Sequence, residues 1–437
     1  MKVGVISLGC SKNRVDTEMM LGILRRAGYE LTADEREADI LIVNTCGFIE
    51  PAKQESIETL LSLAEYKKTG HLRLLCATGC LSQRYPAELS EGLPEVDVFL
   101  GVNQYEQLPQ VLEQALAGSR PCLTDRDSHI LCGSRILTTP PYTAYERIAD
   151  GCDNRCAYCA IPLIRGGFRS VPMDTVLQEI RELAEQGVRE HVLIAQDTTR
   201  YGMDVAGRSL LPELMDRAAE IPGVDWLRVL YCYPDEVENE LLTVMARHPN
   251  ICRYLDLPLQ HADPDMLRAM NRRGDIARTE EFLAMARSMG FTLRTTMICG
   301  FPGETDAQFE RLMDFVNRVC FDRLGAFAYS AEEDTPGAEM PDQIPEEIKQ
   351  KRLDTLMLAQ QKISLERNRT RIGEECPVLI EQLHDNGVAV GRSSAEAPET
   401  DGVIYVADAD HAGIGEFLNV RITDAAEYDL FAEEAGS

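Results

Sequence analysis

Three closely spaced cysteines constrain this chain more than any other feature. Cys152, Cys156 and Cys159 form the pattern C-x3-C-x2-C. Thiols at this spacing can sit on one tight loop and bind three irons of a 4Fe-4S cluster, which leaves the fourth iron without a cysteine. A structural zinc site would need a fourth Cys or His at similarly short spacing, and none occurs nearby. The pattern therefore predicts an iron-sulfur cluster with one open coordination position.

Fourteen cysteines in a chain without an export signal favour free thiols over disulfides. The apolar run of residues 3–8 is too short for a signal peptide, and Lys12 and Arg14 follow it directly. No run approaches the roughly 18 apolar residues of a membrane span. We therefore expect a cytoplasmic protein whose thiols remain available to metals.

Strand-like and helix-like segments alternate over most of the chain and predict two α/β domains. In residues 1–117, apolar runs at 3–8, 40–44 and 72–76 are each followed by a helix or turn. This pattern predicts a doubly wound parallel sheet. A less regular, proline-containing stretch from residue 118 to residue 142 is interpreted as a linker.

The second predicted domain, residues 138–369, contains six strand-like runs separated by amphipathic helices. The expected strands are residues 144–149, 191–195, 226–231, 253–257, 292–298 and 324–329. Six β/α units predict a partial (β/α)6 TIM-like barrel, because a full eight-stranded barrel would need more chain. A long amphipathic helix over residues 344–369 is expected to pack against it, with Leu353, Leu356, Met357 and Ile363 on one side.

The last segment, residues 371–437, differs from the rest in pattern and in charge. Short strands between Gly, Asp and Ser turns predict a small antiparallel β-barrel. The segment has 15 acidic residues against three arginines, a net charge of −12, within a chain whose net charge is −28. Such a charge disfavours binding to a phosphate backbone and favours a basic partner, although simple solubility would also explain it.

A second group of cysteines is spread along the first domain. Cys10, Cys46 and Cys80 each follow an apolar strand. Loops after parallel strands gather at one edge of a sheet, so the three thiols could converge on one cluster. Three unrelated structural cysteines are the alternative that the residues leave open. The other eight cysteines share no ligand spacing and are expected to be core or incidental residues.

The segment Gly151-Cys152-Asp-Asn-Arg-Cys156-Ala-Tyr158-Cys159 resembles the signature loop of the radical S-adenosylmethionine (SAM) superfamily, and it follows the first strand of the predicted barrel. The resemblance implies that SAM chelates the open iron and is cleaved to a 5′-deoxyadenosyl radical. It also suggests that Tyr158, Gln196, Gly300, Gly303 and Glu304 contact SAM. A solvated loop at Gln196 and a simple turn at Gly300-Phe-Pro-Gly303 are the alternatives.

The segments around the second group, Ser7-Leu-Gly-Cys10-Ser-Lys-Asn13, Asn44-Thr-Cys46-Gly-Phe48 and Gly79-Cys80-Leu-Ser-Gln-Arg84, resemble the amino-terminal domain of the methylthiotransferases. The resemblance covers the whole chain, including a TRAM-like last domain. It implies a second 4Fe-4S cluster on Cys10, Cys46 and Cys80, and two roles for SAM, as methyl donor and as radical source. The expected enzyme transfers a methylthio group to carbon.

Several segments look like the branch of that family that modifies the β-carbon of an aspartate in ribosomal protein S-twelve. They are Ser7–Asn13, residues 195–202, residues 254–261 and residues 329–335, whereas Ser170-Val-Pro172 and Asp334-Thr-Pro-Gly337 depart from the expected patterns. The acidic last domain agrees with a basic ribosomal protein substrate, free or within the ribosome. The rivals are a tRNA adenosine methylthiotransferase and a noncatalytic iron-sulfur ribosome-binding protein. The resemblance also implies two further partners, an electron donor and a sulfur carrier. We expect a monomer. No catalytic acid or base is assigned from the sequence.

Overall fold

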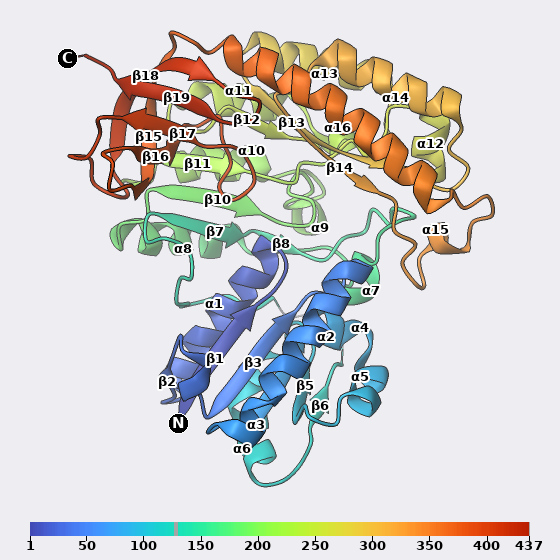
Figure 1. The fold of residues 1–437 in the computed structure, drawn as a ribbon, viewed down its shortest axis with the longest axis vertical. Coiled ribbons are helices and arrows are strands. Elements are labelled where there is room, and N and C mark those ends of the chain that lie inside the picture. The colour runs from blue at the N-terminus through green and yellow to red at the C-terminus, as the bar shows by residue number, and fades with distance from the viewer. Residues whose placement is uncertain (126–129, 437) are drawn as a thin grey trace.

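The computed structural model describes residues 1–125 and 130–436, and it arranges them in three regions that follow one another along the chain (Figure 1). Residues 126–129 of the predicted linker, and Ser437 at the end of the last predicted domain, lie outside the described residues. None of the helices in the described part of the chain is long and apolar enough to cross a membrane.

The amino-terminal region is a parallel six-stranded sheet with the strand order β2-β1-β3-β4-β5-β6. Its strands are β1 (Lys2–Ser7), β2 (Glu30–Leu31), β3 (Ile40–Thr45), β4 (Leu74–Gly79), β5 (Val98–Leu100) and β6 (Cys122–Leu123). Its helices are α1 (Ser11–Arg26), α2 (Glu50–Ala64), α3 (Tyr66–Thr69), α4 (Cys80–Arg84), α5 (Pro86–Gly92) and α6 (Leu108–Leu116).

Helices cover both faces of this sheet, which confirms the predicted doubly wound fold. On one face, Met20 of α1 and Leu112 of α6 pack with Ile42 of β3. On the other face, Leu60 of α2 and Leu89 of α5 share a separate core with the sheet. β3 and β4 are buried along their whole length, as central strands of a covered parallel sheet must be.

The central region has six parallel strands in chain order, which confirms the predicted open barrel. Two sheets, β7-β10-β11 and β12-β13-β14, are joined by an isolated bridge between Leu227 and Ile251. The strands are β7 (Thr143–Arg147), β10 (Glu190–Ile194), β11 (Trp226–Val229), β12 (Tyr254–Asp256), β13 (Thr292–Cys299) and β14 (Arg323–Ala328), with a short pair β8 (Ala149–Asp150) and β9 (Arg169–Ser170). The helices are α7 (Ile161–Arg165), α8 (Met173–Glu185), α9 (Met203–Ala206), α10 (Leu211–Ala219), α11 (Asn239–Arg247), α12 (Pro264–Ala269), α13 (Ile276–Ser288), α14 (Asp306–Val319), α15 (Pro336–Glu339) and α16 (Glu346–Arg369).

Helix α16 is the predicted long connector, and it lies along β14 and α14 (Figure 1). Leu356 and Ile363 are buried as expected, whereas Leu353 and Met357 are only half-buried. The buried side also contains polar residues that the apolar pattern did not indicate, namely Lys349, Arg352, Gln360, Ser364 and Asn368. Lys349, Arg352 and Gln360 donate hydrogen bonds to the barrel, and Asn368 accepts one from Arg323, so this contact is polar as well as apolar.

The carboxy-terminal region is a closed five-stranded barrel with the order β15-β16-β17-β19-β18. Its strands are β15 (Glu375–Leu383), β16 (Ala389–Arg392), β17 (Ile404–Ala407), β18 (Phe417–Ala425) and β19 (Leu430–Glu434). Four of the pairings are antiparallel as predicted, and β17 and β19 pair in parallel. β18 follows β17 in the chain but pairs with β15 and not with β17. β19 lies between β17 and β18 and runs antiparallel to β18, so it is parallel to β17.

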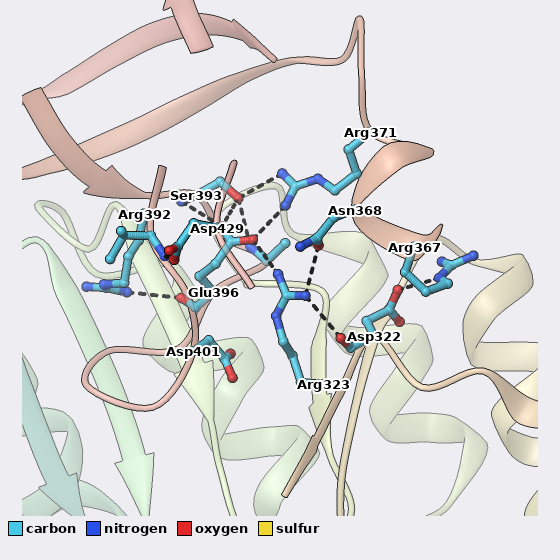
Figure 2. A network of polar contacts seen from close by, with 12 residues as sticks. Asp322, Arg323, Arg367, Asn368, Arg371, Arg392, Ser393, Glu396, Asp401 and Asp429 are labelled. Carbon is cyan, nitrogen blue, oxygen red and sulfur yellow. Dashed lines mark hydrogen bonds and ion pairs between the residues drawn. The ribbon is translucent and has the colours of Figure 1, made fainter. Parts of the chain in front are cut away.

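The small barrel docks on the central region through buried ion pairs (Figure 2). Glu396, in the loop after β16, accepts hydrogen bonds from Arg323 of β14 at 3.0 Å and from Arg371 at 2.6 Å. Arg392 of β16 binds Glu190 of β10 at 2.7 Å. These contacts involve residues that are distant in the sequence, so the last region is fixed on the central one.

Candidate active site

The loop of the first cysteine group, residues 151–160, lies between β8 and α7 and is held by backbone hydrogen bonds. The N–H of Cys152 donates to Gly166 O at 3.1 Å, and the N–H of Ala157 donates to Met270 O at 2.9 Å. Gly151 has φ +77°, and a Cβ there would lie 2.1 Å from the carbonyl oxygen of Gly167. The tight path of this loop therefore requires glycine at position 151.

The other three cysteines follow β1, β3 and β4, as the strand pattern predicts. Cys10 precedes α1, Cys46 follows β3 directly, and Cys80 is the first residue of α4. Because these strands are parallel neighbours in the sheet, their carboxyl ends bring the three loops to one edge. The hydroxyl of Ser56 accepts the N–H of Cys46 at 3.0 Å, which fixes the middle loop.

All six cysteines line one cavity of about 350 Å³ between the amino-terminal and central regions. The remaining lining residues are Lys12, Asn13, Phe48, Asn154, Tyr158, Ile161, Ile164, Arg165, Gln196, Tyr231, Cys232, Tyr233, Pro258, Gln260 and Arg272. Of the eight cysteines expected to be incidental, only Cys232 reaches the cavity. Two cysteine groups from different regions of the chain thus face a common space.

The two donor sets consist of thiols, which are the side chains that iron-sulfur clusters use as ligands. Within residues 1–125 and 130–436, no three His, Cys, Asp or Glu side chains surround a point that one metal ion could occupy. Three thiols that each bind a different iron of a cluster do not need to meet at such a point. The six thiols, spread around one cavity in two groups of three, are therefore compatible with two cubane clusters.

Burial changes the acidity of these thiols. Removal from water raises the pKa of Cys80 to about 12 and that of Cys152 to about 12, and burial also raises the pKa of Cys46. Thiolates are the metal-binding form, so any metal that binds these residues must displace protons.

A buried ionic network connects the two groups. Arg165 of α7 donates to Asp16 of α1 at 2.7 Å and to Asp150 at 3.1 Å. The same guanidinium lies 3.8 Å from Cys80 Sγ. Arg147 of β7 also binds Asp16, and all four charged residues are nearly inaccessible to solvent. Because breaking a buried pair leaves an uncompensated charge, this network fixes the two regions relative to each other.

The loop of Cys152, Cys156 and Cys159 is surrounded by aromatic and polar side chains. Arg272 donates to the hydroxyl of Tyr158 at 3.1 Å and stacks on the ring of Tyr233 at 4.2 Å. The hydroxyl of Tyr233 lies 3.9 Å from Cys156 Sγ. Asn154 donates to the buried carboxylate of Asp197 at 2.7 Å. The loop is therefore preorganised by its neighbours.

The residues predicted to contact SAM separate into two sets. Tyr158 and Gln196 line the cavity, and a buried oxygen of the Gln196 amide has no partner in the described part of the chain. Gly300, Gly303 and Glu304 are not among the lining residues. Glu304 is buried and binds His261 at 3.0 Å and Arg352 of α16 at 2.6 Å. In this structure, Glu304 therefore connects the turn to α16.

Sequence reasoning missed several lining residues, among them Lys12, Arg165, Tyr231, Gln260 and Arg272. Lys12 lies two positions after Cys10, and Tyr231 follows β11, so the position after a strand end was an available signal for both. Nothing in the local sequence indicates Arg272 or Arg165, because only the tertiary fold brings them to the cysteines.

Comparisons with known proteins agree with this organisation. Residues 2–101 match the family UPF0004, residues 147–316 match the radical SAM superfamily, and residues 372–434 match the TRAM domain. A protein of Desulforamulus reducens named ribosomal protein uS12 methylthiotransferase RimO is 49% identical over 99% of both chains. A protein of Clostridioides difficile with the same name is 47% identical over 99% of this chain and 98% of its own.

Solved structures show the same architecture at low sequence identity. The radical SAM methyltransferase TsrM from Kitasatospora setae has a TM-score of 0.55 and 15% identity, over 74% of this chain and 72% of that one. The cobalamin-dependent SAM radical enzyme OxsB has a TM-score of 0.52 and 12% identity, over 82% of this chain and 56% of that one. These likenesses concern the fold.

Proposed function

The chain belongs to the family of ribosomal protein uS12 methylthiotransferases named RimO, and on this basis we infer that it transfers a methylthio group to ribosomal protein uS12 by radical SAM chemistry. The group is added to the β-carbon of an aspartate. The proposed domains are residues 1–117, which carry one cluster, residues 138–369, the radical SAM core, and residues 371–437, the TRAM-like barrel.

The observation that carries this proposal is the single cavity lined by all six cysteines. Transfer of a methylthio group needs a sulfur source and a carbon radical close to each other, since the two must combine before either reacts with water. A common cavity meets this requirement, and two separate sites would not.

We propose two 4Fe-4S clusters, one on Cys10, Cys46 and Cys80, the other on Cys152, Cys156 and Cys159. When bound, the second cluster with SAM supplies the radical, and the first holds the sulfur that is methylated and transferred. The protein supplies six thiolates, the buried arginine network behind Cys80, and aromatic walls at Tyr158 and Tyr233.

The acidic last region supports a basic protein as substrate, but only part of its charge faces solvent. Glu396 is buried against arginines, and the exposed Glu399 is paired with Arg14 of α1 at 2.7 Å. Exposed carboxylates remain at Asp385, Asp408, Asp410, Glu416, Asp424 and Glu433. They would attract a positively charged ribosomal protein and repel phosphate groups.

The test uses the full chain, reconstituted with iron and sulfide under anaerobic conditions and supplied with reductant, SAM and either purified uS12 or tRNA. We expect a methylthio group on an aspartate of uS12, detected by mass spectrometry, and unchanged tRNA nucleosides. Methylthioadenosine in tRNA with unmodified uS12 would contradict the proposal in favour of the nucleic acid substrate.

Single cysteine variants test the division of roles. Cys156→Ala should abolish formation of 5′-deoxyadenosine, and Cys46→Ala should retain it while methylthio transfer stops. Iron content should fall from about eight atoms per chain to about four in each variant. Cys122→Ala is the control, because Cys122 is exposed and outside the cavity, and it should behave as the unmodified protein. Methylthio transfer by Cys46→Ala would remove the first group from the mechanism.

A further inference from the structure

The cavity differs from the rest of the molecule in its charges. The chain contains 72 acidic residues and has a net charge of −28, yet the cavity lining includes no Asp or Glu. Three cations line it, namely Lys12, Arg165 and Arg272. Cations that line a cavity in an otherwise acidic protein favour the binding of anionic groups in that cavity.

The three cations differ in how they are held. Arg165 has carboxylate partners in Asp16 and Asp150. Arg272 is held by the hydroxyl of Tyr158, the carbonyl of Pro258 at 2.8 Å and the ring of Tyr233. Lys12 differs from both, because no hydrogen bond or ion pair of its ammonium is found within the described residues.

Lys12 is only 6% exposed, and its Nζ lies 2.8 Å from the centroid of the Tyr231 ring. A ring face attracts a cation but does not neutralise its charge. The Lys12 ammonium is not one of the fully buried polar atoms without a partner in the described residues, and Lys12 lines the cavity, so the ammonium is open to that space. A cation in this position can pair with an anion that enters the cavity.

The position of Lys12 identifies which anion it suits. Lys12 lies two residues after Cys10, and its ammonium faces Tyr231 on the central region. It is thus at the junction of the two cysteine groups, where the acceptor carbon must lie during transfer. The proposed substrate carries a carboxylate one bond from that carbon.

We propose that Lys12 binds the side-chain carboxylate of the uS12 aspartate that receives the methylthio group. The assignment rests on the proposed function. An ammonium on this carboxylate fixes the β-carbon beside it and rejects an uncharged amide, since the buried cation would then remain unpaired. The methionyl carboxylate of SAM is the other carboxylate in the reaction, and the experiment separates the two sources.

The experiment measures binding of two ligands to two forms of the reconstituted full chain. The ligands are purified uS12 and the same protein with asparagine in place of the target aspartate, and the forms are the unmodified chain and Lys12→Met. We expect the unmodified chain to prefer the aspartate ligand by roughly 10- to 100-fold. Lys12→Met should bind both ligands equally, and Lys12→Arg should restore part of the preference.

Two further measurements separate this role from a structural one. The affinity for SAM and the EPR signals of the clusters should be the same in Lys12→Met as in the unmodified chain. Its melting temperature should not fall, because the Lys12 ammonium makes no ion pair within the described residues and methionine has a similar volume. Lys68→Met is the control, since Lys68 is 69% exposed and paired with Glu65, and it should keep the preference.

One outcome would overturn the assignment, namely an aspartate preference that survives in Lys12→Met. If SAM affinity is lost in the same variant, the SAM carboxylate is the ligand. If its melting temperature is lower instead, Lys12 is structural. If the unmodified chain does not modify uS12 at all, the proposed function fails, and that result is distinct from a surviving preference.

Discussion

Gly79 shows at the scale of one residue how closely the cysteine loops approach each other. It precedes Cys80 and has φ +93°, and a Cβ there would lie 2.3 Å from Asn44 Oδ1 and 2.6 Å from Thr45 O. Two constraints therefore act at this position, a left-handed backbone and contact with the neighbouring strand β3. Any side chain would push Cys80 away from the cavity.

Gly79→Ala should lower the free energy of unfolding by at least ~2 kcal/mol, the sum of left-handed strain and a clash with backbone. Urea denaturation measures this, and iron content should fall with it. Gly28→Ala is the matched control, because Gly28 has φ +86° with nothing within 4 Å of the added Cβ. Equal losses in the two variants would show that the contact with β3 has no effect.

Residues of the site differ in how far the sequence can reveal them. Cys152, Cys156 and Cys159 are predicted as ligands from local spacing alone. Cys10, Cys46 and Cys80 depend on strand context, and the assignment of all six as cluster ligands stays a prediction. Lys12 was visible only as part of a motif, since its position over the Tyr231 ring without an ion-pair partner is a property of the assembled fold.

At the scale of elements, long apolar runs were predictable and short ones were not. Residues 40–44 and 292–298 were expected as strands and are β3 and β13. The edge strands β2 and β6 have two residues each, which is too short for any alternation to be read. Helix α16 was located correctly, but its buried Arg352 and Gln360 depend on partners far away in the sequence.

Arg352 links α16 to the central barrel through its ion pair with Glu304. Arg352→Met should destabilise the protein by about 3–5 kcal/mol, because it leaves the buried carboxylate of Glu304 without its guanidinium partner. Chemical denaturation at neutral pH measures this change. Arg318→Met, which removes an exposed pair with Glu280, should cost less than about 1 kcal/mol. A loss of similar size in the two variants would contradict a special role for the buried pair.

At the scale of the whole molecule, two buried glutamates join the last region to the central barrel. Burial opposes ionisation of Glu396, but Arg371 and Arg323 outweigh it and lower the pKa to about 2. Burial likewise opposes ionisation of Glu190, and Arg392 and Arg228 lower its pKa to about 2. Both carboxylates therefore stay charged in the folded protein at pH values where the unfolded chain would bind a proton.

The stability from these carboxylates should be complete above the ordinary glutamate pKa of 4.5 and be lost as pH falls from there toward 2. Each contributes on the order of 3 kcal/mol. Urea denaturation at a series of pH values measures the loss. The Glu396→Gln variant should be less stable than the unmodified protein at pH 7. Its free energy of unfolding should fall less on acidification. An unchanged pH slope in that variant would contradict the role of Glu396.

The loop after β16, residues 393–401, contacts side chains from four strands of the central barrel. The contacts are made by Tyr145 of β7, Arg228 of β11, Tyr254 of β12 and Arg323 of β14. During synthesis this loop leaves the ribosome after the whole central barrel. Until it arrives, Arg228 and Arg323 lack partners that the finished fold provides. A polypeptide that stops short of residue 393 therefore lacks these contacts, so the last region to be made stabilises the barrel that was made before it.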